Sequence, residues 1–166
     1  MAIMSDRLLL TSTLLAALGA ALVGGVFFAF STFVMKALAR LAPAHGIAAM
    51  QSINVVVINA WFMAALFGTA ALCAGLVAWA MLNWQRPAAG LILVGGLLYL
   101  GGTIAVTILF HVPRNNALAV IDPVDPDAAR LWARYVATWT IGNHVRTAAA
   151  LGAAAALILA MVKRGP

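Results

Sequence analysis

The chain has 166 residues, of which 65% are hydrophobic and only 8% are charged, whereas about 25% of the residues of a soluble domain are charged. This composition excludes an ordinary water-soluble globular domain. The formal net charge of +6 comes from basic residues scattered along the chain, without the blocks of like charge typical of nucleic-acid-binding tails, so we expect no nucleic-acid partner.

Four apolar stretches, at residues 8–35, 53–82, 88–112 and 139–162, each have about the 20 residues that a helix needs to cross a bilayer. The first is longer than the apolar region of a signal peptide, which has about 7–15 residues, so we expect it to be retained. The sequence therefore predicts an all-α fold, an integral membrane four-helix bundle that forms a single domain over residues 1–166 and has one sizeable extramembrane loop.

Two features mark helix boundaries in the second half of the chain. Pro113 is expected to stop the third span, because proline lacks a donor N–H and clashes with the preceding turn. Asp125, Pro126 and Asp127 form a helix start, with a carboxylate at the N-cap and proline at the first helical position. We therefore expect one helix over residues 126–163, with an extension that projects beyond the lipid before span four.

Small residues recur four apart in three of the spans, a spacing that lets helix backbones approach closely in a membrane. We expect these faces to hold a compact bundle together, and they also permit a homo-oligomer. The residues are Ala16, Ala20 and Gly24 in the first span, Ala60, Ala64 and Gly68 in the second, and Ala148, Gly152, Ala156 and Ala160 in the fourth.

Polar residues gather at one end of the predicted bundle. With an even number of crossings, the segment between spans one and two shares a membrane face with the segment between spans three and four. All three histidines and five of the six asparagines fall on or near this face, which predicts a functional site there. The counts of Lys and Arg do not fix the orientation. If the arginines that serve the site are left out of this count, we expect both termini to face the cytoplasm. The membrane is expected to be a bacterial inner membrane.

One stripe of the fourth helix is the richest pattern in the chain. Trp132, Tyr135, Trp139, Asn143 and Arg146 follow one another at spacings of three and four, which places them on one helix face. Such a face suits stacking of a flat aromatic ligand and hydrogen bonding to its oxygens. The alternative for the aromatic members is an interfacial belt at headgroup level.

Arg146 lies inside an apolar span, where a charge is costly and usually faces the bundle interior with a partner. The alternative is snorkelling to the interface. For an inward arginine we expect Asn54, Asn59 or a carbonyl group near Pro113 as partners. No acid lies within any span, so the counter-charge would come from a loop aspartate or from a ligand, which favours an anionic or oxyanionic ligand.

Histidines near the same end are candidates for proton transfer, because an unperturbed pKa of about 6.5 suits a proton acceptor at neutral pH. His144 follows Asn143 on the fourth helix, and His111 ends the third span. Each has the alternative of being a plain interfacial histidine. The pair could also hold haem b, or a metal ion together with His45. No two histidines stand at i and i+4 and the chain has no glutamate, so we expect no metal and no cofactor.

Asparagines complete the candidate set. Asn54 and Asn59 lie in the first two turns of the second predicted span, about 140° apart around the helix. We expect one of them to be a hydrogen-bond partner between helices and the other to line a pocket. Asn115 follows Pro113, where it either contacts a ligand or builds the turn.

Five short segments form a combination that is specific although each segment alone is short. They are FSTFVM at 30–35, MQSIN at 50–54, NAWFM at 59–63, VPRNNAL at 112–118, and the segment from Trp139 through Asn143, His144 and Arg146 to Thr147. This combination resembles the anthrone oxygenase-like family of small four-span membrane proteins. Two positions depart from the family pattern. Lys36 replaces an expected proline, and Gly142 replaces an expected tryptophan, which would loosen the pocket wall.

The resemblance implies the four-span fold and an activity, since the fungal members oxidise anthrones to anthraquinones without a cofactor. On this hypothesis His144 is the base, Arg146 with Asn143 or Asn54 holds the oxyanion, and Trp139 stacks on a lipophilic aromatic substrate. The remaining predicted substrate contacts are Asn59, His111, Asn115 and Tyr135. The second hypothesis is a non-catalytic membrane protein that binds a membrane lipid or quinone, or that assembles with a partner.

Overall fold

The computed structural model describes residues 6–163, so that residues 1–5 and 164–166 of the predicted domain lie outside it. The described chain is helical without strands, and the helices follow one another almost end to end. In chain order they are α1 (Asp6–Ala29), η1 (Phe30–Val34), α2 (Met35–Leu38), α3 (Pro43–Val56), α4 (Ala60–Leu82), α5 (Ala89–Leu97), η2 (Leu98–Ala105), η3 (Thr107–His111), α6 (Val112–Ala119) and α7 (Ala128–Lys163), where η denotes a π-helix.

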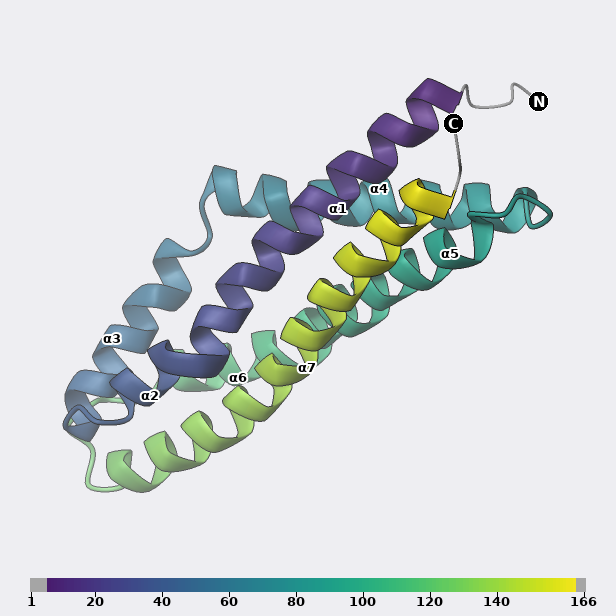
Figure 1. The fold of residues 1–166 in the computed structure, drawn as a ribbon. Coiled ribbons are helices and arrows are strands. Elements are labelled where there is room, and N and C mark those ends of the chain that lie inside the picture. Colours follow the sequence, from purple (N-terminus) through teal and green to yellow (C-terminus); the bar gives the residue numbers. More distant parts are fainter. Residues whose placement is uncertain (1–5, 164–166) are drawn as a thin grey trace.

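Four continuous helical segments of this chain are long and apolar enough to cross a membrane. They are the first span (Asp6–Leu38), the second span (Ala60–Leu82), the third span (Ala89–Ala119) and the fourth span (Ala128–Lys163). The prediction of an all-α membrane bundle with four spans is therefore confirmed. Both ends of the described chain lie at the same end of the bundle (Figure 1), as four crossings require. Which side of the membrane that end faces stays a prediction.

The end of the bundle near the termini is held together by small side chains. α1 and α7 lie side by side along their length, with α4 and α5 packed beside them (Figure 1). Ala16, Ala20 and Gly24 are buried, and a Cβ on Gly24 would lie only 2.9 Å from the Leu151 side chain of α7. The close approach of α1 and α7 therefore depends on the small residues of α1.

The small-residue stripe of the second span has a different place from the one expected. Ala60, Ala64 and Gly68 are exposed on the outer side of α4, and Gly68 has no other atom within contact distance of the position of a Cβ. α4 packs inward through a face that includes Leu66 instead. The expectation that this stripe helps hold the four spans together is therefore wrong.

The second predicted span is divided at the junction between α3 and α4. α3 ends at Val56, and Asn59 has an extended backbone, with φ −120° and ψ 160°. Its side-chain oxygen accepts a hydrogen bond from the backbone N–H of Phe62 at 3.0 Å, which is the geometry of a helix N-cap. The 23 residues of α4 extend over about 34 Å, enough to cross the hydrocarbon core by themselves.

The third span does not stop at Pro113. Helical structure continues through η3 into α6 and ends at Ala119, with Pro113 in the first turn of α6, where the missing N–H of proline is tolerated. The expected helix stop is therefore wrong, and Asn115 lies on a helix instead of in a loop. α7, by contrast, is one helix of 36 residues, and its start at Ala128 is two residues from the predicted one.

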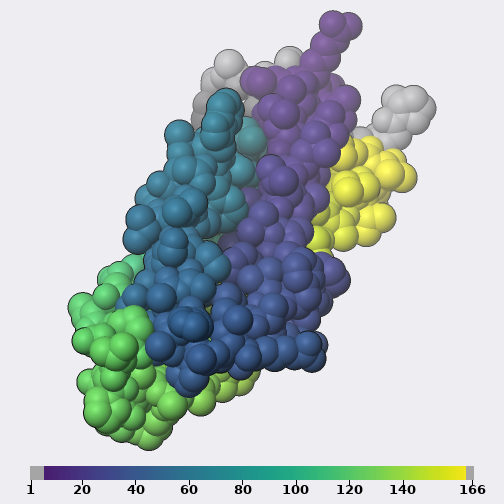
Figure 2. Space-filling view, turned by 90° about the vertical axis from the view of Figure 1, so that its left-hand side faces the viewer, coloured from purple at the N-terminus to yellow at the C-terminus, as the bar shows by residue number. Residues whose placement is uncertain are grey.

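α3 covers the polar end of the bundle. It lies against the segment that joins α6 to α7, drawn in blue next to green in Figure 2. The Gln51 side chain donates hydrogen bonds to the carbonyl oxygens of Leu118 at 2.9 Å and Ile121 at 3.0 Å. Gly46 packs on the indole ring of Trp132, which would lie 2.7 Å from a Cβ. α3 is thus fixed over this end by hydrogen bonds and by close packing.

Candidate functional site

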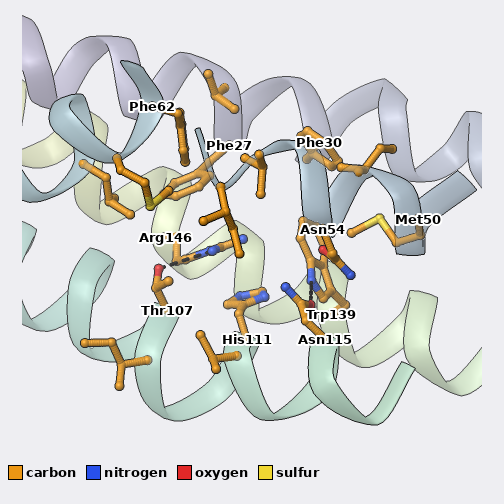
Figure 3. Close-up of a pocket in the computed structure, with 18 of the residues that line it drawn as sticks. Phe27, Phe30, Met50, Asn54, Phe62, Thr107, His111, Asn115, Trp139 and Arg146 are labelled. Atoms are coloured by element: carbon orange, nitrogen blue, oxygen red, sulfur yellow. Dashed lines mark hydrogen bonds between the residues drawn. The ribbon is translucent and has the colours of Figure 1, made fainter. Parts of the chain in front are cut away.

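A cavity of about 240 Å³ lies between α3, α4 and the first, third and fourth spans (Figure 3). An apolar cavity of about 150 Å³ holds one benzene molecule, so this one has room for more than a single ring. Aromatic and aliphatic side chains form most of its wall. They include Phe27, Phe30, Met50, Phe62, Met63 and Leu66. An apolar wall with few polar groups is typical of a site for a small lipophilic molecule.

Arg146 is the one permanently charged residue among the described residues that line the cavity. Its side chain is 5% exposed, and its guanidinium carbon lies 4.1 Å from the centre of the Phe27 ring. Nη1 donates to the Thr107 hydroxyl at 3.2 Å and Nη2 donates to the Asn143 carbonyl oxygen at 2.7 Å. These partners differ from the ones expected from the sequence.

No carboxylate pairs with Arg146 in the described part of the chain, and its Nε has no hydrogen-bond partner there. A guanidinium stays charged in proteins, and a buried charge without a counter-charge is costly. The site therefore has the electrostatic character of a receptor for an anionic oxygen.

Asn143 holds the guanidinium in place. It is fully buried, and its Nδ2 donates to the Phe27 carbonyl oxygen at 2.7 Å and to the Ser31 hydroxyl at 2.8 Å. Those two bonds turn the amide oxygen towards Arg146. The Ser31 hydroxyl lies 2.9 Å from that of Thr147. Because protein groups use both ends of the amide and the cavity wall does not include it, Asn143 is placed to orient Arg146.

His111 also lines the cavity, on the third span next to Thr107 (Figure 3). It is 1% exposed, and neither ring nitrogen makes a well-formed hydrogen bond within the described chain. Its ring contacts Trp139 edge-on, with centroids 4.9 Å apart. A buried polar group left unpaired costs about 1–3 kcal/mol, so a ligand that bonds to His111 would recover this energy.

The π-helical register explains why Thr107, His111 and Asn115 reach one cavity. These residues stand four apart, and in an α-helix each step of four drifts about 40° around the axis. η3 has wider turns with i→i+5 bonds, which offset part of this drift. Thr107 was missed by the sequence analysis, and its four-residue spacing from His111 was the available signal.

Asn115 connects the third and fourth spans. Its side-chain oxygen accepts hydrogen bonds from the Tyr135 hydroxyl at 2.9 Å and from Trp139 Nε1 at 3.0 Å. Asn115 and Trp139 line the cavity, whereas Tyr135 lies behind them and stacks on Trp132 with ring centroids 5.7 Å apart. Much of the predicted stripe on α7 is therefore a buried wall that fixes Trp139 at the cavity.

The other predicted site residues are divided between the cavity and the surface. Asn54 lines the cavity, with its Nδ2 buried and without a well-formed hydrogen bond. Asn59 caps α4 outside the cavity wall. His144 is exposed on the outer side of α7, because successive helical residues are about 100° apart and its neighbour Asn143 points inward. The expected pairing of His144 as base with Arg146 is therefore wrong in its geometry, because His111 and not His144 lines the cavity with Arg146.

The alternative of a haem or metal site has no matching donor set. His111 is buried whereas His45 and His144 are exposed, so these side chains do not converge. Over residues 6–163 no three His, Cys, Asp or Glu side chains form a group suited to a metal ion. The two-histidine and three-histidine sets proposed from the sequence are therefore not formed by the described residues, and the absence of a cofactor stays a prediction.

Gly142, which stands where the family pattern has a tryptophan, was expected to loosen the pocket wall, but the structure shows close packing there. A Cβ at this position would lie 2.4 Å from the Phe110 ring and 2.9 Å from His111 Nε2. Those two side chains occupy the space beside the glycine, and the Arg114 guanidinium lies over the Phe110 ring, 3.3 Å from the ring centre. Gly142 thus allows His111 to pack directly against α7.

The fold and the cavity together define an integral membrane helical bundle with an internal, mostly apolar cavity that contains one buried arginine. A family model for anthrone oxygenase matches residues 58–156, a range that contains Thr107, His111, Asn143 and Arg146. The match extends over more than half of the chain, which therefore belongs to the anthrone oxygenase family and is an oxygenase-like membrane protein. No curated protein and no solved structure matches the chain.

Proposed function

We propose that the protein oxidises a lipophilic phenolic or anthrone-type compound with dioxygen inside this cavity, by proton abstraction and without a cofactor. The observation that carries the proposal is the buried Arg146, which lacks a carboxylate partner and lines an apolar cavity together with an unpaired His111. Family membership supports the same reaction class.

The first step is removal of a proton from the substrate. In an anthrone the acidic C–H and the carbonyl lie at opposite positions of the central ring. His111 accepts the proton at a ring nitrogen, and the electron pair moves into the ring and onto the carbonyl oxygen. The resulting oxyanion is held by Arg146, whose Nη1 is positioned by its hydrogen bond to the Thr107 hydroxyl, one helical turn from His111. A preorganised donor of this kind is worth about 3 kcal/mol in the transition state.

The second step is reaction of this electron-rich anion with dioxygen. A C–O bond forms at the carbon that lost the proton, and the peroxide takes a proton back from His111. Loss of water then gives the second carbonyl group, so that anthrone and dioxygen become anthraquinone and water. Phe27, Phe30 and Trp139 supply aromatic faces for the rings, and the apolar wall keeps bulk water from the anion.

The test uses the purified protein in lipid nanodiscs with anthrone as the substrate. We expect oxygen uptake matched by anthraquinone formation, and a rate about 10²-fold lower for Arg146→Gln. Arg134→Gln is the control, because Arg134 is exposed on the same helix and its loss should leave the rate unchanged. Equal rates in the two variants would remove Arg146 from the reaction. Tight anthraquinone binding without any oxygen uptake would favour the non-catalytic lipid- or quinone-binding hypothesis instead.

A further inference from the structure

The cavity has an opening on the outer side of the bundle. Four of its apolar lining residues are also exposed, with exposed fractions of 71% for Ile58, 50% for Phe67, 50% for Ile108 and 43% for Val112. Ile58 and Phe67 belong to the α3–α4 junction and to α4, whereas Ile108 and Val112 belong to the third span. The opening therefore lies between α4 and the third span.

This opening is within the membrane-spanning part of the protein. Phe67 is seven residues beyond the first residue of α4, which is about 10 Å along the helix. Ile108 is eleven residues before the end of the third span. No charged side chain is among the exposed residues at the rim. The rim thus meets the hydrocarbon interior of a bilayer, where apolar side chains are at no disadvantage.

The polar end of the bundle is closed by contrast. α3 packs against the α6–α7 segment there (Figure 2), and its inner side chains Ile47 and Met50 are almost fully buried. Gln51 fastens α3 to two carbonyl groups of the segment after α6, and Leu118 is buried beneath it. A ligand arriving from water at this end would have to displace α3.

We propose that the ligand of the cavity enters and leaves sideways, from the hydrocarbon interior of the membrane, through the gap between α4 and the third span. The identity of the ligand and its deprotonation beside His111 rest on the proposed function, whereas the route does not. A charge is costly in hydrocarbon, so the ligand crosses the gap uncharged. It loses its proton only beside His111, and the oxyanion meets Arg146, which lines the cavity and is only 5% exposed.

The test narrows the gap without changing the polar groups of the site. Ile108→Trp adds bulk at the rim, and Leu109→Trp is the matched control, since Leu109 is the next residue, is 76% exposed and does not line the cavity. Both variants gain the same fluorophore. The probe is anthraquinone, whose association with and dissociation from protein in phosphatidylcholine nanodiscs are followed by quenching of tryptophan fluorescence.

We expect Ile108→Trp to slow association and dissociation alike, each by roughly tenfold or about 1.4 kcal/mol in the barrier, with little change in Kd. Leu109→Trp should leave both rates as in the unaltered protein. Equal rates for the two variants would overturn the proposal, and so would a weaker Kd with an unchanged association rate, because Ile108 would then be only part of the wall.

Failure of this proposal is distinguishable from failure of the proposed function. Oxygen uptake with anthrone together with unaltered rates in Ile108→Trp would sink the lateral route and leave the oxidation intact. Slowed exchange of anthraquinone without oxygen uptake would leave the lateral route and sink the oxidation.

Discussion

Replacing Asn143 by aspartate tests whether the uncompensated charge of Arg146 serves the reaction. The amide oxygen of Asn143 already accepts a hydrogen bond from Arg146 Nη2 at 2.7 Å. Asn143→Asp keeps the shape and this bond, and places a carboxylate against the guanidinium. The variant thus supplies inside the protein the counter-charge that the substrate oxyanion supplies in the proposed mechanism.

The magnitude follows from the geometry. Opposite charges about 4 Å apart attract by about 4 kcal/mol at an effective dielectric constant of about 20. A similar amount of stabilisation is withdrawn from the substrate oxyanion once Arg146 is neutralised. We therefore expect the rate of anthrone oxidation to fall by at least about 10²-fold, which corresponds to roughly 3 kcal/mol.

The fold should tolerate the change. Asn143→Asp loses both hydrogen bonds that Nδ2 donates, to the Phe27 carbonyl oxygen and to the Ser31 hydroxyl, each worth about 1 kcal/mol. The Ser31 hydroxyl can donate to the new carboxylate instead, and the new ion pair with Arg146 offsets part of the remaining loss. Asn83→Asp is the matched control, because Asn83 also donates to a backbone carbonyl, that of Trp79 at 2.9 Å, at the far end of α4. Anthraquinone formation in nanodiscs and thermal unfolding are measured for both variants. A wild-type oxidation rate in folded Asn143→Asp would refute the role of the unpaired charge.

Three further predictions concern the other groups at the cavity. His111→Gln should lower the oxidation rate by about 10²-fold or more, as expected for loss of a general base. His144→Gln should leave the rate unchanged, because His144 is exposed. The reverse result would restore His144 as the base. Gly142→Ala places a Cβ 2.4 Å from the Phe110 ring and should lower the free energy of unfolding by about 1–3 kcal/mol through overpacking, with a lower oxidation rate as His111 shifts. In Gly152→Ala the nearest atom lies at an ordinary 3.4 Å, so unfolding measurements that rank the two glycine variants equally would contradict the close packing at Gly142. Asn115→Ala leaves the Tyr135 hydroxyl and Trp139 Nε1 without their common acceptor, so we expect thermal unfolding to show a loss of stability of about 1–3 kcal/mol per unpaired group. The control is the neighbouring Asn116→Ala, at an exposed position, which is expected to be neutral. Equal stability of the two variants would show that the shared acceptor is unimportant.

The inward position of Arg146 could be predicted from the sequence, but its hydrogen-bond partners could not. An arginine inside an apolar stretch, with no acid in any of the four predicted stretches, already indicates an inward charge that needs an anion. Its actual partners, Thr107 and Asn143, could not be chosen from several polar residues near the same end, because the choice depends on which helices are neighbours and on their rotation about their own axes.

Which histidine lines the cavity could not be predicted from the sequence. His111 and His144 are of the same residue type and lie at the same end of the bundle, so composition and spacing do not separate them. The packed structure does, because the inward face of α7 is fixed by Asn143 and Arg146, which leaves His144 outside. The π-helical register of the third span brings His111 into line with Thr107, and no simple residue pattern predicts a π-helix.

The sequence by itself determined the four apolar spans, the class of membrane protein and the family, because span length and hydrophobicity are local properties and the family pattern is a string of residues. Only the tertiary structure decided that residues 43–56 form a separate helix over the polar end, that the cavity opens between α4 and the third span, and that His111 lies at the cavity. These depend on contacts between residues far apart in the chain, such as Gln51 with Leu118 and Asn143 with Phe27. In lipid, where hydrophobic burial does little to select among helix faces, such polar contacts and the fit of small residues set the rotation of each helix.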